Sequence, residues 1–265
     1  MRDDLTRTID DLLRRRDEGR VPPFTRVVIE TSGLADPAPI LQTLMTDAQI
    51  AARIVLGGVA ATVDAVHGVR TLGREAVSAK QVAVADRLVL TKSDLVGSAP
   101  LDLRERLRAL NASAPVLDAH HGRIDPKSLF DAGPYDPLAK SFDAQSWLGE
   151  GTAHSHDHGI ETYAILRDAP IHAVTLALLL ETLAEHCGAD LLRLKGIVSI
   201  AESPDRPAVI HGVQHVFHPP AWLARWPSDD RRSRIVVISR GIPRGFIEAL
   251  IDALDGEVAE VSGSR

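Results

Sequence analysis

The sequence predicts an α/β protein in which a doubly wound parallel sheet is followed by a smaller α+β domain. Strand and helix patterns alternate through residues 1–130, and this alternation is typical of a parallel sheet with helices on both faces. Residues 131–159 are rich in Gly, Pro, Asp, Ser and His, which indicates a linker. Three strand patterns in succession within residues 160–256 favour an antiparallel sheet. A chain of 265 residues with 45% hydrophobic side chains can bury both cores.

The first segment is expected to form an amphipathic helix, because Leu5, Ile9 and Leu12 recur at helical spacing. An apolar run at residues 26–30 then predicts a strand buried on both faces. The patterns that follow predict a helix at 37–44, a strand at 54–63, a helix at 65–82, a strand at 87–91, a helix at 101–110 and a strand at 115–118.

The second domain shows longer patterns. They predict a strand at 160–167, a helix at 172–187, strands at 191–201, 208–217 and 234–240, and a final helix at 243–254.

Composition excludes several classes of protein. A formal net charge of −6 gives no general electrostatic reason to bind nucleic acid or an acidic membrane. The single cysteine, Cys187, excludes an internal disulfide, and its place in an apolar helix pattern favours an inert buried thiol. No signal peptide opens the chain and no apolar run is long enough to span a bilayer, so we expect a cytoplasmic protein without nucleic-acid or membrane partners.

An acidic residue and a glycine follow the predicted strand at 26–30. Glu30 stands at the carboxyl end of that strand, and Gly33 comes three residues later. A phosphate-transfer site needs an acid near Mg²⁺ or water and a glycine whose backbone can approach the γ-phosphate. The pattern therefore gives Glu30 and Gly33 as candidate catalytic residues, while a plain strand, turn and helix N-cap remains the alternative.

The predicted strand at 87–91 runs into TKSDL, which has the residues of a guanine-recognition loop. Guanine presents an N–H and an NH₂ side by side, and a carboxylate such as Asp94 accepts both. The stem of Lys92 can lie along the base. We take Thr91, Lys92 and Asp94 as candidate nucleotide-binding residues.

A Walker A loop is missing from this sequence. That loop needs Gly-Lys-Ser/Thr to cradle the phosphates and hold Mg²⁺, but none of the five lysines has this context. We expect the chain as written to bind GTP poorly and not to hydrolyse it.

Eight segments carry a shared family pattern, at residues 1–13, 30–44, 61–65, 81–95, 110–115, 191–200, 211–220 and 234–242. With them the chain resembles, over nearly its whole length, the CobW-like family of P-loop GTPases, which is associated with metal delivery. The resemblance implies an N-terminally incomplete GTPase domain, because the family places its P-loop and its Cys-X-Cys-Cys motif ahead of the segment that matches Met1–Leu13.

The resemblance also implies ligands and partners. It implies GTP or GDP with Mg²⁺ where an upstream P-loop is present, bound Zn²⁺ or Co²⁺, and a client protein that receives the metal. It places Leu110–Pro115 where the family completes its guanine pocket. Two hypotheses follow: a metal-delivery G protein, or a non-catalytic remnant that binds metal or protein. The oligomeric state stays open, and a homodimer is one option.

The predicted linker carries a histidine-rich segment, HSHDHG. His154, His156 and His158 can face the same side of an extended chain, and imidazoles suit Zn²⁺, Co²⁺ or Ni²⁺. They are candidate metal ligands. The alternative is a polar linker without a stable site.

Overall fold

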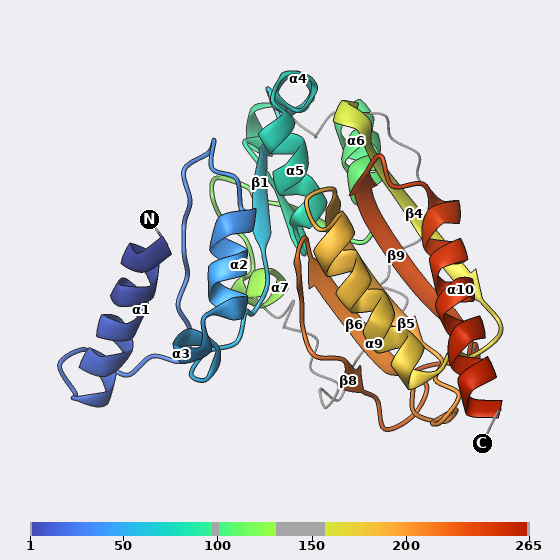
Figure 1. The fold of residues 1–265 in the computed structure, drawn as a ribbon. Helices are drawn as coiled ribbons and strands as arrows, with labels where there is room; N and C mark the ends of the chain where they lie inside the picture. Colours follow the sequence, from blue (N-terminus) through green and yellow to red (C-terminus); the bar gives the residue numbers. More distant parts are fainter. Residues whose placement is uncertain (1, 97–100, 131–156, 264–265) are drawn as a thin grey trace. The chain divides into compact units, whose positions relative to one another are not determined.

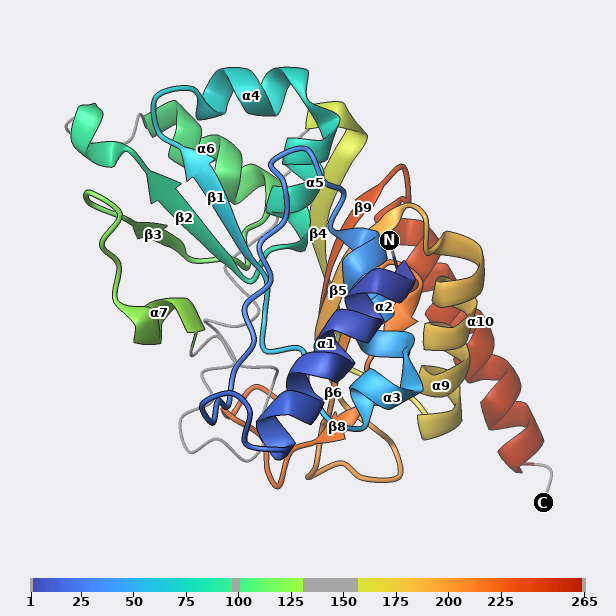
Figure 2. The ribbon, with the colours of Figure 1, turned by 90° about the vertical axis from the view of Figure 1, so that its left-hand side faces the viewer.

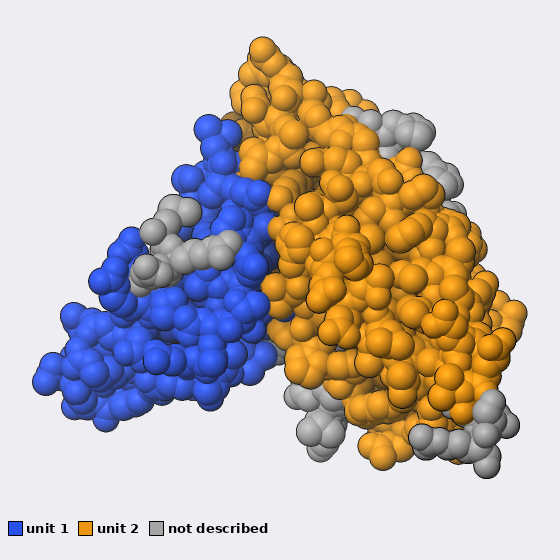
Figure 3. Space-filling view, viewed as in Figure 1, with its two compact units in different colours: residues 1–56 blue, residues 57–265 orange. Residues whose placement is uncertain are grey.

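The computed structural model describes residues 2–96, 101–130 and 157–263 (Figure 1). The chain divides into unit 1, residues 1–56, and unit 2, residues 57–265 (Figure 3). Each unit has its own hydrophobic core. Among the described residues, none of the helices is both long and apolar enough to cross a membrane.

Unit 1 contains helices α1 (Arg2–Asp17), α2 (Ala38–Thr46) and α3 (Ala48–Ala51). The apolar stripe of α1 packs on α3, and the side chains that meet there are at most 3% exposed: Ile9, Leu13 and Ile50. The helices predicted at the amino end and at 37–44 are therefore confirmed.

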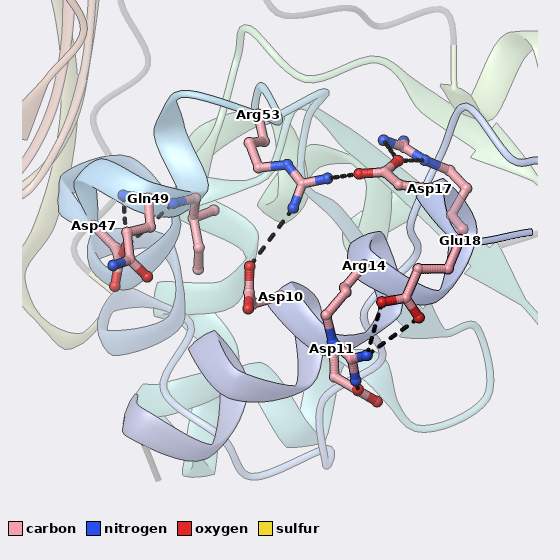
Figure 4. A network of polar contacts seen from close by, with 10 residues as sticks. Asp10, Asp11, Arg14, Asp17, Glu18, Asp47, Gln49 and Arg53 are labelled. Carbon is pink, nitrogen blue, oxygen red and sulfur yellow. Dashed lines mark hydrogen bonds and ion pairs between the residues drawn. The ribbon is translucent and has the colours of Figure 1, made fainter. Parts of the chain in front are cut away.

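Polar contacts surround this small core (Figure 4). Arg53 pairs with Asp17 and, at 3.6 Å, with Asp10. Asp47 caps α3 by accepting hydrogen bonds from the amides of Gln49 and Ile50 at 3.0 and 3.1 Å. Surface ion pairs contribute little each, so the apolar contacts supply most of the stability of unit 1.

The strand predicted at 26–30 is wrong. These residues belong to no sheet, and Val28 is 68% exposed while Ile29 packs on the helical core of unit 1. A strand needs a neighbour for its amides and carbonyls, and the described part of unit 1 offers this segment none. Its apolar residues are therefore divided between the helices and solvent.

Unit 2 begins with a parallel sheet of order β1-β2-β3, made of β1 (Ala60–Asp64), β2 (Arg87–Thr91) and β3 (Val116–Asp118) (Figures 1 and 2). The parallel sheet and the strand at 87–91 are confirmed. The strand predicted at 54–63 pairs only from Ala60 onward, and Val55 before it is 70% exposed.

The helices of this half largely follow the prediction. α6 (Leu101–Leu110) has the predicted bounds. The helix predicted at 65–82 is two helices, α4 (Gly68–Arg74) and α5 (Ala76–Val84). Glu75 separates them because its backbone is extended, with φ −112° and ψ 102°. A short helix, α7 (Pro126–Phe130), was not predicted.

The second sheet of unit 2 is antiparallel, in the order β4-β9-β5-β6-β7. Its strands are β4 (Ile160–Arg167), β5 (Leu191–Val198), β6 (Ala208–Val213), β7 (Val216–Phe217), β8 (Ala221–Trp222), which pairs with β6, and β9 (Ser233–Arg240). The strand predicted at 208–217 is a hairpin, because Gln214 adopts φ 52° and reverses the chain between Val213 and Val216.

Two helices cover one face of this sheet, α9 (Ala173–Thr182) and α10 (Arg244–Gly263) (Figures 1 and 2). A π-turn, Leu183–Cys187, continues α9. The apolar residues between these helices and the strands form a large hydrophobic core. The predicted α+β domain is confirmed.

The two sheets of unit 2 are joined by a buried ionic cluster around Asp86, which directly precedes β2. Arg193 of β5 donates to the Asp86 carboxylate and to the Val84 carbonyl. Lys195 lies 3.1 Å from the same carboxylate, whose other oxygen accepts from the Val59 amide at 2.9 Å. All three charged residues are at most 8% exposed.

Burial and charge act in opposite directions in this cluster. Burial by itself raises the pKa of Asp86, but Arg193 and Lys195 together move it far below its usual range. Burial, reinforced by Arg193, lowers the pKa of Lys195 to about 8 in spite of Asp86. Asp86 is therefore the anion that makes the burial of two cations tolerable.

Replacing Asp86 by alanine is expected to lower the free energy of unfolding by about 3–5 kcal/mol, because two buried cations lose the carboxylate that they share. Urea unfolding followed by circular dichroism measures this loss. The control is Asp205→Ala, which removes an exposed pair with Arg231 and is expected to cost less than about 1 kcal/mol. Equal losses in the two variants would contradict this role of Asp86.

Candidate nucleotide-binding site

The TKSDL segment forms a sharp turn at the carboxyl end of β2. Thr91 closes the strand, and its hydroxyl donates to the Val63 carbonyl at 3.3 Å. Lys92 takes a left-handed backbone conformation, with φ 60° and ψ 22°, and a single 3₁₀ turn, Ser93–Leu95, follows. Non-glycine residues adopt this conformation at a cost, and such residues gather at ligand sites.

The turn is tied to the loop that follows β3. Ser93 is 2% exposed, and its hydroxyl donates to the Ala119 carbonyl at 3.2 Å. The Asp94 side chain, 20% exposed, then faces His121, whose backbone amide and Nδ1 lie 3.4 and 3.3 Å from the two carboxylate oxygens. The carboxylate of Asp94 therefore lies at the edge of the sheet, beside the loop that follows β3.

Lys92 reaches in the opposite direction, toward β1. Its Nζ lies 2.7 Å from Oδ2 of Asp64, the last residue of β1. The other oxygen of Asp64 accepts from the amides of Val66 and His67 at 2.7 and 3.1 Å. Burial raises the pKa of Asp64, but the bonds from Lys92 and the two amides outweigh it, so the net shift is downward. Asp64 is an anion at neutral pH.

The segment Leu110–Pro115, which the resemblance assigns to the guanine pocket, does not lie beside Asp94. That segment precedes β3, and the Pro115 carbonyl accepts from the Leu88 amide near the start of β2. Because β2 and β3 are parallel, it lies at the edge of the sheet opposite Asp94. The buried Asn111 instead bonds to the final carbonyls of α5.

His121, which faces Asp94, comes from the loop that follows β3. Neighbouring parallel strands end at the same edge of a sheet. The strands predicted at 87–91 and 115–118 were therefore enough to predict that the loops after them lie side by side. Asp64 could have been found in the same way, since the strand predicted before it also ends near Thr91 in the register.

Glu30 and Gly33 lie in unit 1. Glu30 is exposed, and a Cβ built at Gly33 would meet no atom within 4 Å. Packing within unit 1 therefore gives no reason for a glycine here. The catalytic roles of both residues stay predictions.

The histidine segment is only partly described. His154 and His156 lie outside the described residues. His158, at φ 55°, has Nε2 2.9 Å from the Leu72 carbonyl of α4. A carbonyl only accepts, so Nε2 is the donor in this contact, and in the neutral tautomer Nδ1 keeps its lone pair. In the described part of the chain, no group of three or more His, Cys, Asp or Glu side chains is placed to hold a metal ion.

Cys187 is half-buried. Burial, and to a lesser extent Asp190, raises the pKa of its thiol, which agrees with the inert thiol expected from the sequence.

Two family models match the chain. The CobW/HypB/UreG nucleotide-binding domain matches residues 1–118, and the C-terminal domain of the cobalamin synthesis protein cobW matches residues 160–255. The chain belongs to the CobW family. The resemblance stated from the sequence is therefore confirmed, and with it a family of metallochaperone-type GTPases.

The relatives of this CobW-family chain bear names from zinc handling. It is 32% identical to the zinc chaperone YjiA of Escherichia coli over 247 residues, which cover 92% of this chain and 75% of that protein. It is 23% identical to the zinc-regulated GTPase metalloprotein activator 1 of Saccharomyces cerevisiae, covering 92% of this chain and 65% of that protein. It is 25% identical to the zinc chaperone CobW of a Sinorhizobium species, with 95% and 76% covered.

Solved structures confirm the fold. The crystal structure of Zn(II)-bound YjiA GTPase from E. coli superimposes with a TM-score of 0.77 at 32% identity, and the match covers 93% of this chain and 76% of that one.

Proposed function

We propose that this chain is a cytoplasmic metal-delivery protein of the zinc-chaperone kind, which recognises the base of GTP or GDP and passes Zn²⁺ or Co²⁺ to a client protein. The observation that carries the proposal is the Asp94 carboxylate, held at the carboxyl edge of a parallel sheet in a turn whose lysine is already oriented. Ligands of α/β sheets bind at this edge.

The residues fit a guanine base. Its N1–H and exocyclic NH₂ match the two oxygens of Asp94, and the competing contacts from His121 are long, at 3.3 and 3.4 Å. The stem of Lys92 runs from the end of β2 toward Asp64 and borders the same edge. A base bound at this edge of the sheet would contact Lys92 on the side of β1 and Asp94 on the side of β3.

The chain offers fewer residues to bind the phosphates of GTP than to bind its base. None of the lysines stands in a Gly-Lys-Ser/Thr context, and Lys92 is engaged by Asp64. When Mg²⁺ is bound with GTP, it neutralises charge on the phosphates, and Glu30 is the residue that we propose beside it. The base half of the site therefore has more support than the phosphate half.

The proposal that the chain binds a metal ion rests on His158. Metal-bound histidines usually donate their second ring N–H to a carbonyl or carboxylate, and His158 makes such a contact with Leu72. Its Nδ1 is left to bind a borderline cation. His154 and His156 are the further ligands that we propose, and the zinc chaperones among the relatives support zinc as the metal.

Asp94→Asn is expected to weaken GDP binding about 30-fold, which is the loss of about 2 kcal/mol for hydrogen bonds to a charged group. The amide presents one acceptor and one donor, which complement the N1–H and the C2 carbonyl of xanthine. Xanthosine diphosphate should therefore gain affinity. Ligand-observed NMR, which detects weak complexes, measures both.

The matched control is Asp118→Asn, which removes a carboxylate at the end of β3 that pairs with Arg104 at 2.6 Å. It should leave the preference for guanine unchanged. A preference for guanine that persists in Asp94→Asn would contradict base recognition by this loop.

Replacing His154, His156 and His158 together by alanine is expected to weaken Zn²⁺ binding at least about tenfold, because the proposed ligands are lost. Competition with a chromophoric chelator measures the affinity of the full chain. His186→Ala, which removes a 72% exposed imidazole elsewhere, is the control. Unchanged zinc stoichiometry and affinity in the triple variant would show that the segment is only a polar linker.

GTP turnover by these 265 residues is expected to stay at the level of a protein-free blank, since they lack a Walker A sequence. Phosphate release with Mg²⁺ measures turnover, and E. coli YjiA is the positive control. GTP-specific turnover by the chain would refute this expectation. Its absence, together with zinc binding, would favour the non-catalytic metal- or protein-binding alternative.

A further inference from the structure

Within the described residues, Asp64 is the acidic side chain that pairs with Lys92, and the register of the sheet explains why. β1 and β2 pair in parallel, with Asp64 at the end of β1 opposite Thr91 at the end of β2. Lys92 is therefore the first residue after β2 and lies next to the end of β1. The left-handed backbone of Lys92 then turns the chain, and the side chain spans the ends of the two strands to reach Oδ2 at 2.7 Å.

The carboxylate of Asp64 is itself fixed before any ligand arrives. Oδ1 accepts the amides of Val66 and His67 at the start of α4, which leaves Oδ2 directed at Lys92. The two oxygens of Asp64 therefore bind different groups. Oδ1 stabilises the turn that leads into α4, and Oδ2 pairs with the ammonium group of Lys92.

A lysine at this position needs such an anchor. The Lys92 side chain is 55% exposed, and a free lysine stem samples many rotamers, so ordering it costs conformational entropy. An anchored ammonium removes most of that freedom in advance. The stem of Lys92 then lies along the edge of the sheet, between Asp64 and the position proposed for the base.

We propose that Asp64 is a positioning residue of the guanine site, which holds the Lys92 ammonium so that the stem is ordered before the base binds. This inference rests on the proposed function and deepens it. Asp64 does not touch the nucleotide and acts only through Lys92.

The test is a double-mutant cycle with Asp64→Asn and Lys92→Ala, read out as GDP affinity by ligand-observed NMR titration. Asparagine still accepts the two amide bonds that close the turn but loses the charge that holds Lys92. Asp64→Asn alone is expected to weaken GDP binding about three- to tenfold, the value of immobilising one long side chain in advance. In the Lys92→Ala background the same substitution should have no effect.

Each outcome decides the matter. Additive effects of the two substitutions would show that Asp64 acts independently of Lys92 and overturn the inference. Unchanged affinity in Asp64→Asn would also overturn it, while a guanine-to-xanthine switch in Asp94→Asn would leave the proposed function standing. Absence of GDP binding by the unaltered chain would overturn both. Asp118→Asn, with the same loss of charge, should bind GDP as the unaltered chain does, and thermal unfolding of all variants verifies that they fold.

Discussion

The packing of unit 2 depends on one buried carboxylate, that of Asp86. It accepts from Arg193 and Lys195 of the antiparallel sheet and from the Val59 amide beside the parallel sheet. Removing ions from water costs several kcal/mol each, and this cost is offset only when the partners meet in one geometry. The pairing therefore fixes how β5 lies against the start of β2. The hydrophobic contacts around it stabilise the arrangement but are less directional.

The same strand links this anchor to the candidate site. Asp86 directly precedes β2, and Thr91, which ends it, leads into the turn with Lys92 and Asp94. A strand that is buried along its length and fixed at its amino end gives its carboxyl end a defined position. Neighbouring strand ends then supply Asp64 on one side and His121 on the other. Preorganisation of this kind lowers the cost of binding.

The proposed base recognition and the proposed metal binding rest on different observations. The proposed base recognition has residues in place at one edge of a sheet, and the family's nucleotide-binding domain matches residues 1–118. Metal binding has one described imidazole with its proton fixed by a carbonyl. Two of the relatives are named zinc chaperones. A protein that couples nucleotide to metal needs both parts, and this chain carries residues suited to each.

The sequence by itself determined the class of fold, the family and most helix and strand positions, because these follow from local periodicity and from short motifs. Guanine recognition by TKSD stays a prediction. The sequence could not determine pairing. The apolar run at 26–30 looks like a strand, but it has no neighbour to pair with and packs on helices instead. Arg193 and Lys195 carry no local sign that they meet Asp86, and the contact of Asp64 with Lys92 depends on the pairing of β1 with β2. Only the tertiary structure decides these contacts, because they join segments that are distant in sequence. Asp64 and Lys92 meet through the register of β1 and β2, whereas Arg193 and Lys195 meet Asp86 between two separate sheets.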